Sequence, residues 1–173
     1  MVLARLILGL LNIAPMTGYD VKKHVDSTIR HFWAADKAQV YRTLAGLVRD
    51  GYATVEVVPG VGLPDRQEHH ITEAGRRALT EWLASDLTPH AEREPFLARI
   101  FFAGSLGREQ VLDLLRERRA QAEVLLTELT ARRARHAEAH DRGGYLMLAT
   151  LENGLTHVRA ELEWLDTVER NLP

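Results

Sequence analysis

The stretch that decides the fold is KAQVYRTLAGLVRDGY, residues 37–52. Its apolar residues recur at helical spacing, which predicts an amphipathic helix with one buried face. That face carries Val40, Leu44, Leu47 and Val48. The other side carries an amide, a guanidinium, a hydroxyl and a bare backbone, from Gln39, Arg42, Thr43 and Gly46. Such a face is either a solvated surface or one that reads another molecule.

The segments around this helix predict a second pattern. Residues 2–13 are apolar almost all round, which predicts a buried helix. Thr17 and Asp20 form a capping-box pattern that begins a helix reaching about residue 28, and Asp36 is a good N-cap for the next one. After a left-handed cap at Gly51, the period changes and predicts two strands with a Gly/Pro-rich turn between them. These strands are residues 52–58 and 66–71, and Thr72 caps a fourth helix.

Three helices followed by a hairpin are the pattern of a winged helix-turn-helix. Beyond it, residues 88–95 are polar and carry two prolines, as a linker does. A short apolar helix at 95–104 and two long helices at 107–140 and 144–171 are expected next. We therefore expect a mainly α chain with a small β-hairpin. Its N-terminal winged helix-turn-helix DNA-binding domain covers residues 1–86, and antiparallel long helices form a dimerisation domain at 91–173.

The two long helices carry heptad-like apolar seams. A single antiparallel hairpin would leave part of each seam exposed to water, so a second copy of the chain is expected to cover it. The residues predicted to mediate this homodimer are Val111, Leu115, Leu125, Leu129, Leu151, Leu155, Leu162 and Leu165.

Composition excludes several classes of protein. The 173 residues include no cysteine, which rules out disulfides and thiolate metal sites and favours a cytoplasmic location. No run approaches the roughly 20 apolar residues of a membrane span. The sequence has no G-x-S-x-G, H-E-x-x-H or P-loop motif, so neither an enzyme nor a cofactor is expected. His69 and His70 are adjacent on a strand and point to opposite faces, so no metal site is expected from them.

The charge is divided unevenly. Residues 1–85 hold ten Lys/Arg against nine Asp/Glu, and residues 86–173 hold twelve against fifteen, for a net charge of −2 overall. The positive end of the chain is therefore N-terminal. Lys22 and Lys23 are adjacent in the second helix, and Lys37 begins the third.

The outward face suits the major groove of double-stranded DNA, which admits one helix and displays hydrogen-bonding base edges. Gln39 can pair with adenine, Arg42 with guanine, and Thr43 with a phosphate or a thymine methyl group. The further candidate DNA contacts are Lys22, Lys23 and Lys37 to phosphates, the Tyr41 hydroxyl, and Arg66 on the wing.

Three motifs, in order, resemble the PadR family of transcriptional regulators. They are P-x-[ST]-G-Y-[DE] at residues 15–20, Q-[IV]-Y-x-x-L-x-x-L-x-x-x-G at 39–51 and [IV]-T-x-x-G at 71–75. The segments PFLARIFFAG and LENGLTHVRAELEWL resemble the C-terminal domain of the virulence activator α branch of that family. The resemblance implies a dimeric one-component repressor whose two recognition helices read a palindrome. It also implies a small-molecule effector, with Trp33 as a candidate contact, because aromatic residues line a ligand site in some members.

The wing departs from the family pattern. Where the family usually has G-R-P-x-[RK]-[RK]-x-Y-x-[IV]-T, this chain has GLPDRQEHHIT at residues 62–72. Arg66 is the one base left there, between Asp65 and Glu68. This weak wing and the negative net charge leave a second hypothesis, in which the chain is a dimeric helical interaction protein that no longer binds DNA specifically.

Overall fold

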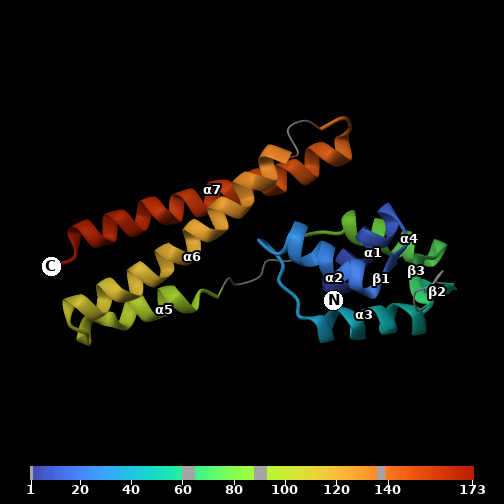
Figure 1. Cartoon of the computed structure of the whole chain (residues 1–173), viewed down its shortest axis with the longest axis horizontal. Helices are drawn as coiled ribbons and strands as arrows, with labels where there is room; N and C mark the ends of the chain where they lie inside the picture. Colours follow the sequence, from blue (N-terminus) through green and yellow to red (C-terminus); the bar gives the residue numbers. More distant parts are fainter. Residues whose placement is uncertain (1, 60–64, 88–92, 136–138) are drawn as a thin grey trace. The chain divides into compact units, whose positions relative to one another are not determined.

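Helices and short strands alternate in the first half of the chain, and long helices dominate the second half (Figure 1). The computed structural model describes residues 2–59, 65–87, 93–135 and 139–173. The chain divides into two compact units, Met1–Pro89 and His90–Pro173. This mainly helical architecture with a small antiparallel sheet confirms the predicted fold class.

Three helices precede the hairpin of the first unit: α1 (Val2–Ile13), α2 (Gly18–His24) and α3 (Lys37–Arg49). The predicted capping box at the start of α2 is present, with the Asp20 backbone N–H donating to Thr17 Oγ1 at 3.1 Å. α2 leads into a π-helical turn, η1 (Val25–Ile29), so the second helix changes its hydrogen bonding in its last turn. Gly51 has φ 77°, as expected of a residue that ends a helix in the left-handed region.

The sheet has three antiparallel strands, β1 (Met16–Thr17), β2 (Ala53–Val58) and β3 (Arg66–Ile71), in the order β1-β3-β2. The sequence did not predict β1, because two residues are too few to show an alternating pattern. Its pairing of Met16 with His69 joins the break after α1 to the hairpin. The predicted turn falls on residues 59–65, of which 60–64 lie outside the described residues.

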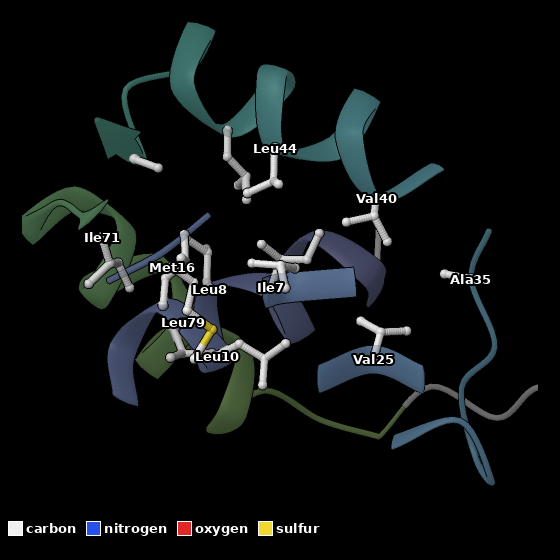
Figure 2. Packing of buried hydrophobic residues seen from close by; sticks show 14 residues of the cluster. Ile7, Leu8, Leu10, Met16, Val25, Ala35, Val40, Leu44, Ile71 and Leu79 are labelled. Carbon is white, nitrogen blue, oxygen red and sulfur yellow. The ribbon is translucent and has the colours of Figure 1, made fainter. Parts of the chain in front are cut away.

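Thr72 begins α4 (Glu73–Leu83), as predicted, and accepts a hydrogen bond from the Gly75 backbone N–H at 3.1 Å. Its own hydroxyl donates to the Gly51 carbonyl at 2.8 Å, which links the end of α3 to the start of α4. The core of the first unit is apolar (Figure 2). Its fully buried side chains include Ile7, Leu8, Val21, Val25, Val40 and Leu44. The buried face of α3 is therefore the one that its sequence predicted.

The second unit consists of α5 (Pro95–Phe102), the 3₁₀ turn η2 (Ala103–Ser105), α6 (Arg108–Arg135) and α7 (Arg142–Asn171). α6 and α7 run antiparallel and lie side by side (Figure 1). Ion pairs cross between them, including Arg118 Nε to Glu161 Oε1 at 2.6 Å. α6 was expected to continue to residue 140, but residues 136–138 lie outside the described part.

The seams of α6 and α7 face each other within one chain. Six of the eight residues predicted for dimerisation are buried in this hairpin: Val111, Leu115, Leu129, Leu151, Leu155 and Leu165. The other two, Leu125 and Leu162, are partly buried against the same clusters. These leucines therefore hold α6 against α7 and do not form an exposed seam. Two facing seams of similar length cover each other when the chain folds back. That these residues also contact a second copy stays a prediction.

The described ranges contain neither a membrane span nor a metal cluster. No helix there combines the length and the apolar character needed to cross a membrane. No group of three or more His, Asp or Glu side chains there is arranged to hold a metal ion.

Candidate nucleic-acid interface

The exposed side of α3 is a row of small and basic residues. With Val40, Leu44 and Leu47 buried, the opposite side of the helix presents positions one turn apart. These exposed residues are Ala38, Arg42, Ala45 and Arg49. The sequence predicts that Arg42 faces outward, and the structure adds Arg49 to the same face. Its position, seven residues after Arg42, places it on the same face and would have identified it.

Gln39 begins this face and is part of the helix cap. Its backbone N–H donates to Asp36 Oδ1 at 2.7 Å, and its side-chain Oε1 accepts from the Asp36 backbone N–H at 3.0 Å. This reciprocal pair is a capping box. The sequence predicted Asp36 as the cap but gave Gln39 only an outward role. The side chain of Gln39 therefore has a structural contact as well as an exposed position.

Thr43 lies one turn after Gln39. Its hydroxyl donates to the Gln39 carbonyl oxygen at 2.7 Å. Thr43 and Gly46 are half-buried, so they lie at the edge of the exposed face and not at its centre. Of the residues predicted to read bases, Arg42 is the most centrally placed.

Tyr41 lies on the flank of α3 nearest to α2. Tyr41 is 42% exposed, and its ring packs over the backbone of Gly18, where an added Cβ would meet Tyr41 Cε1 at 2.9 Å. The Lys37 ammonium lies 5.7 Å from the centroid of the same ring, a cation–π distance. Tyr41 therefore contacts the start of α2, and Lys37 lies near its ring.

The basic residues predicted to contact DNA differ in how they are paired. Lys22 forms an ion pair with Asp26, and Arg66 Nη2 lies 2.8 Å from Glu68 Oε1. Arg49, on the exposed face of α3, pairs with Asp50 at 2.9 Å, and this carboxylate raises the pKa of the Arg49 guanidinium. Within the described ranges, no carboxylate pairs with Lys23, Lys37 or Arg42.

The other flank of α3 borders a groove of about 660 Å³ within the first unit. Its walls come from the start of α1, the connector before α3, and one edge of α3. Trp33 and Tyr52 supply aromatic surface, and Arg5 lies 5.9 Å from the centroid of the Tyr52 ring. Gln39, Arg42 and Thr43 also line it. The groove and the exposed face of α3 therefore share side chains.

The wing strand β3 carries the two histidines. His69 is half-buried opposite Met16, and burial lowers the pKa of its imidazole. His70 lies on the other face of the strand, with Nε2 3.4 Å from Glu56 Oε2. The two side chains therefore lie on opposite faces of the strand.

The three helices, the hairpin after α3 and the exposed basic row on α3 define a winged helix-turn-helix protein. Residues 7–81 match the model of the transcriptional regulator PadR-like family, and residues 92–172 match the model of the virulence activator alpha C-terminal domain. The chain therefore combines a domain of the PadR-like family of transcriptional regulators with this C-terminal domain. A family of regulators rather than enzymes agrees with the lack of a catalytic motif.

Known proteins resemble the chain over nearly its whole length. It is 24% identical to the negative transcriptional regulator PadR of Bacillus subtilis, over 96% of this chain and 95% of that protein. The crystal structure of B. subtilis PadR in complex with operator DNA has a TM-score of 0.84, with 24% identity and 98% of both chains covered. The structure of the same protein in complex with p-coumaric acid has a TM-score of 0.77, with 24% identity and 98% of both chains covered. At this identity the two structures establish the fold.

Proposed function

We propose that this chain is a transcriptional repressor that binds a palindromic DNA operator as a homodimer and is released by a small molecule. The observation that carries the proposal is the exposed side of α3, where Arg42 lies between Ala38 and Ala45. Two alanines one turn to either side let the helix approach the floor of the major groove closely. A guanidinium in that position can donate two hydrogen bonds to guanine.

The remaining contacts position the helix on the DNA backbone. Lys23 and Lys37 have no carboxylate partner among the described residues, so their ammonium groups suit phosphates. The ring of Tyr41 lies 5.7 Å from the Lys37 ammonium. Lys22 and Arg66 are already paired with carboxylates, so their contribution to phosphate binding is smaller. The wing of this protein therefore adds little affinity, and more of it comes from α2 and α3.

The homodimer would form through exposed apolar side chains of the second unit. Phe101 and Phe102 of α5 are 82% and 77% exposed, and their rings meet edge to face with centroids 4.9 Å apart. Leu97, on the same helix, is also exposed. Exposed apolar clusters of this kind mark protein interaction surfaces. A twofold dimer places two copies of α3 about one DNA turn, roughly 34 Å, apart, which requires a palindromic site.

The groove beside α3 is the candidate effector site. Its volume of about 660 Å³ suits a small molecule, and Trp33 and Tyr52 offer aromatic walls. The structure of B. subtilis PadR with p-coumaric acid shows that a relative binds a small aromatic acid. Arg42 and Gln39 line the groove and also belong to the proposed reading face. A ligand that holds these side chains would therefore compete with DNA.

A gel-shift titration against the DNA upstream of the protein's own gene tests this function. We expect a sequence-specific complex that Arg42→Ala weakens by about 10- to 100-fold, the range for a lost bidentate base contact. Arg108→Ala, an exposed arginine of α6, is the matched control and should bind as the wild type does. A dimer that binds this DNA no better than unrelated DNA would favour the second hypothesis, an interaction protein. The Arg66–Glu68 ion pair on the wing is the observation in favour of that alternative.

A further inference from the structure

The side-chain oxygen of Gln39 already accepts one hydrogen bond before DNA binds. Oε1 accepts the Asp36 backbone N–H at 3.0 Å, which completes the capping box at the start of α3. The amide nitrogen keeps two N–H donors on an exposed side chain, with no recorded partner in the described residues. The capping bond uses one of the two lone pairs of Oε1 and directs the amide oxygen at the Asp36 N–H, while both N–H donors stay available to an incoming molecule.

Thr43 has the opposite character. Its hydroxyl proton is committed to the Gln39 carbonyl oxygen at 2.7 Å, which leaves lone pairs on Oγ1 and the methyl group exposed to other molecules. Arg42, between them in sequence, is a donor only, because a guanidinium has no acceptor atom. The three side chains therefore have fixed hydrogen-bonding roles.

We infer that Gln39 and Arg42 read acceptor atoms on bases, and that Thr43 reads a donor or a thymine methyl group. The inference rests on the proposed function, since it concerns the operator that α3 would read. Gln39 then contacts a purine N7, guanine O6 or thymine O4. The two-bond contact between Gln and adenine is not made, because the amide oxygen would have to turn toward the adenine amino group and away from the Asp36 N–H.

The capping box explains why the Gln39 side chain keeps the same orientation when the protein binds DNA. Turning Oε1 toward a base would break one of the two reciprocal hydrogen bonds that begin α3, and the Asp36 N–H would lose its partner. The donors of Gln39 can reach a base without that loss. The side chain thus stabilises the recognition helix and restricts what it recognises.

Base analogues test this inference atom by atom. The operator is first selected from random duplexes, and the base pair whose substitutions affect the wild type but not Gln39→Ala is identified. At that position, 7-deazapurine removes the N7 acceptor, 5-methyl-2-pyrimidinone removes thymine O4, and a purine without the amino group removes the adenine donor. We expect acceptor removal to weaken wild-type binding about threefold to tenfold, the effect of one hydrogen bond, and amino-group removal to change it less than twofold.

Two results would overturn the inference while leaving the proposed function intact. One is a loss on removing the adenine amino group that equals the loss on removing N7. The other is a Gln39→Ala variant with the same base preference as the wild type at every position. A wild-type protein that selects no sequence would instead overturn the proposed function, and the inference with it.

A second variant separates reading from folding. In Gln39→Glu a carboxylate oxygen can still accept the Asp36 N–H, so the capping box is retained while both donors are lost. Gln110→Glu makes the same change in charge in the second unit, at an exposed position of α6 where Oε1 likewise accepts a backbone N–H, from Gly107 at 2.9 Å. We expect both variants to unfold close to the wild-type temperature and only Gln39→Glu to lose the preference at the identified base. Retention of that preference by Gln39→Glu would contradict the inference.

Discussion

Tyr41 of the recognition helix lies directly over Gly18 of α2, so closely that a Cβ on residue 18 would be 2.9 Å from Tyr41 Cε1 and 3.1 Å from Cζ. The two helices of the helix-turn-helix therefore meet through a ring and a bare backbone. This contact positions the Tyr41 ring against α2. Because Lys37 lies near the same ring, the contact also helps to position Lys37.

We predict that Gly18→Ala destabilises the first unit by about 1–2 kcal/mol, the usual cost of overpacking a tight contact. Tyr41→Ala removes the obstructing ring, so Gly18→Ala should cost almost nothing in that background. Urea denaturation of the four proteins of this cycle gives the coupling. Additive effects of the two substitutions would show that the contact does not constrain α2.

Gly75 of α4 is a more severe case. A Cβ there would lie 2.2 Å from the Tyr52 carbonyl oxygen, and a backbone atom cannot move away as a side chain can. We expect Gly75→Ala to cost about 3 kcal/mol or more, at the upper end of the range for core overpacking. Thermal unfolding followed by circular dichroism measures this.

Gly9, in the middle of α1, is the matched control for that substitution. Nothing lies within 4 Å of its added Cβ, and the helix gains from the better propensity of alanine. Gly9→Ala should therefore stabilise the protein by roughly 0.5–1 kcal/mol. Equal effects at Gly9 and Gly75 would mean that the close approach to Tyr52 does not decide the outcome.

These glycines show what the sequence could and could not predict. The apolar spacing of α3, the caps at Thr17, Asp36 and Thr72, and the left-handed Gly51 follow local rules, so they were predicted. The contact of Gly18 with Tyr41 joins residues 23 positions apart in the chain, and no local pattern encodes it.

In the candidate site, too, local sequence patterns predict some features and not others. Helical spacing indicated that Arg42 is exposed, and it would also have indicated Arg49. The ion pairs of Lys22 and Arg66 depend on rotamers, which a one-dimensional pattern does not specify. The seam on α6 and α7 was recognised correctly as apolar, but spacing alone does not distinguish a partner helix in the same chain from one in a second chain.

The salt dependence of DNA binding should distinguish paired from unpaired cations. Each phosphate contact contributes about 0.9 to the slope of log K against log salt concentration. Lys23→Ala and Lys37→Ala should therefore each lower the slope by close to one unit. Arg66→Ala, in which the lost cation was paired with Glu68, should change it by much less. A fluorescence-anisotropy titration across salt concentrations measures these slopes, and equal changes for all three variants would contradict the pairing argument.

His69 should make the stability of the first unit depend on pH. Burial lowers the pKa of its imidazole below the ordinary value of 6.5. Between that lowered pKa and 6.5 the unfolded chain binds more protons, so stability is complete above about pH 6.5 and falls as the pH falls below it. His69→Phe should reduce the decrease in melting temperature between pH 7 and pH 5.5. His157→Gln, an exposed histidine of α7, serves as the control, and an unchanged pH profile in His69→Phe would exclude His69 as the cause.

The last prediction concerns the second copy of the chain. The buried leucines of α6 and α7 pack within one hairpin, and we expect the exposed aromatic pair of α5 to supply the dimer contact. We expect the wild type to sediment at twice the chain mass of 19.5 kDa and the double variant Phe101→Ser/Phe102→Ser to sediment as a folded monomer. Leu83→Ser, which changes an exposed leucine of the first unit, should remain dimeric.

DNA binding provides the second measurement for this prediction. A monomer keeps the reading face of α3 but contacts one half-site, so the double variant should lose most of its affinity for a full palindrome and little of its affinity for an isolated half-site. Loss of binding to both would indicate that the first unit had been disturbed. A double variant that still sediments as a dimer would place the interface elsewhere, with the exposed start of α7 at Tyr145, Leu146 and Met147 as the next surface to change.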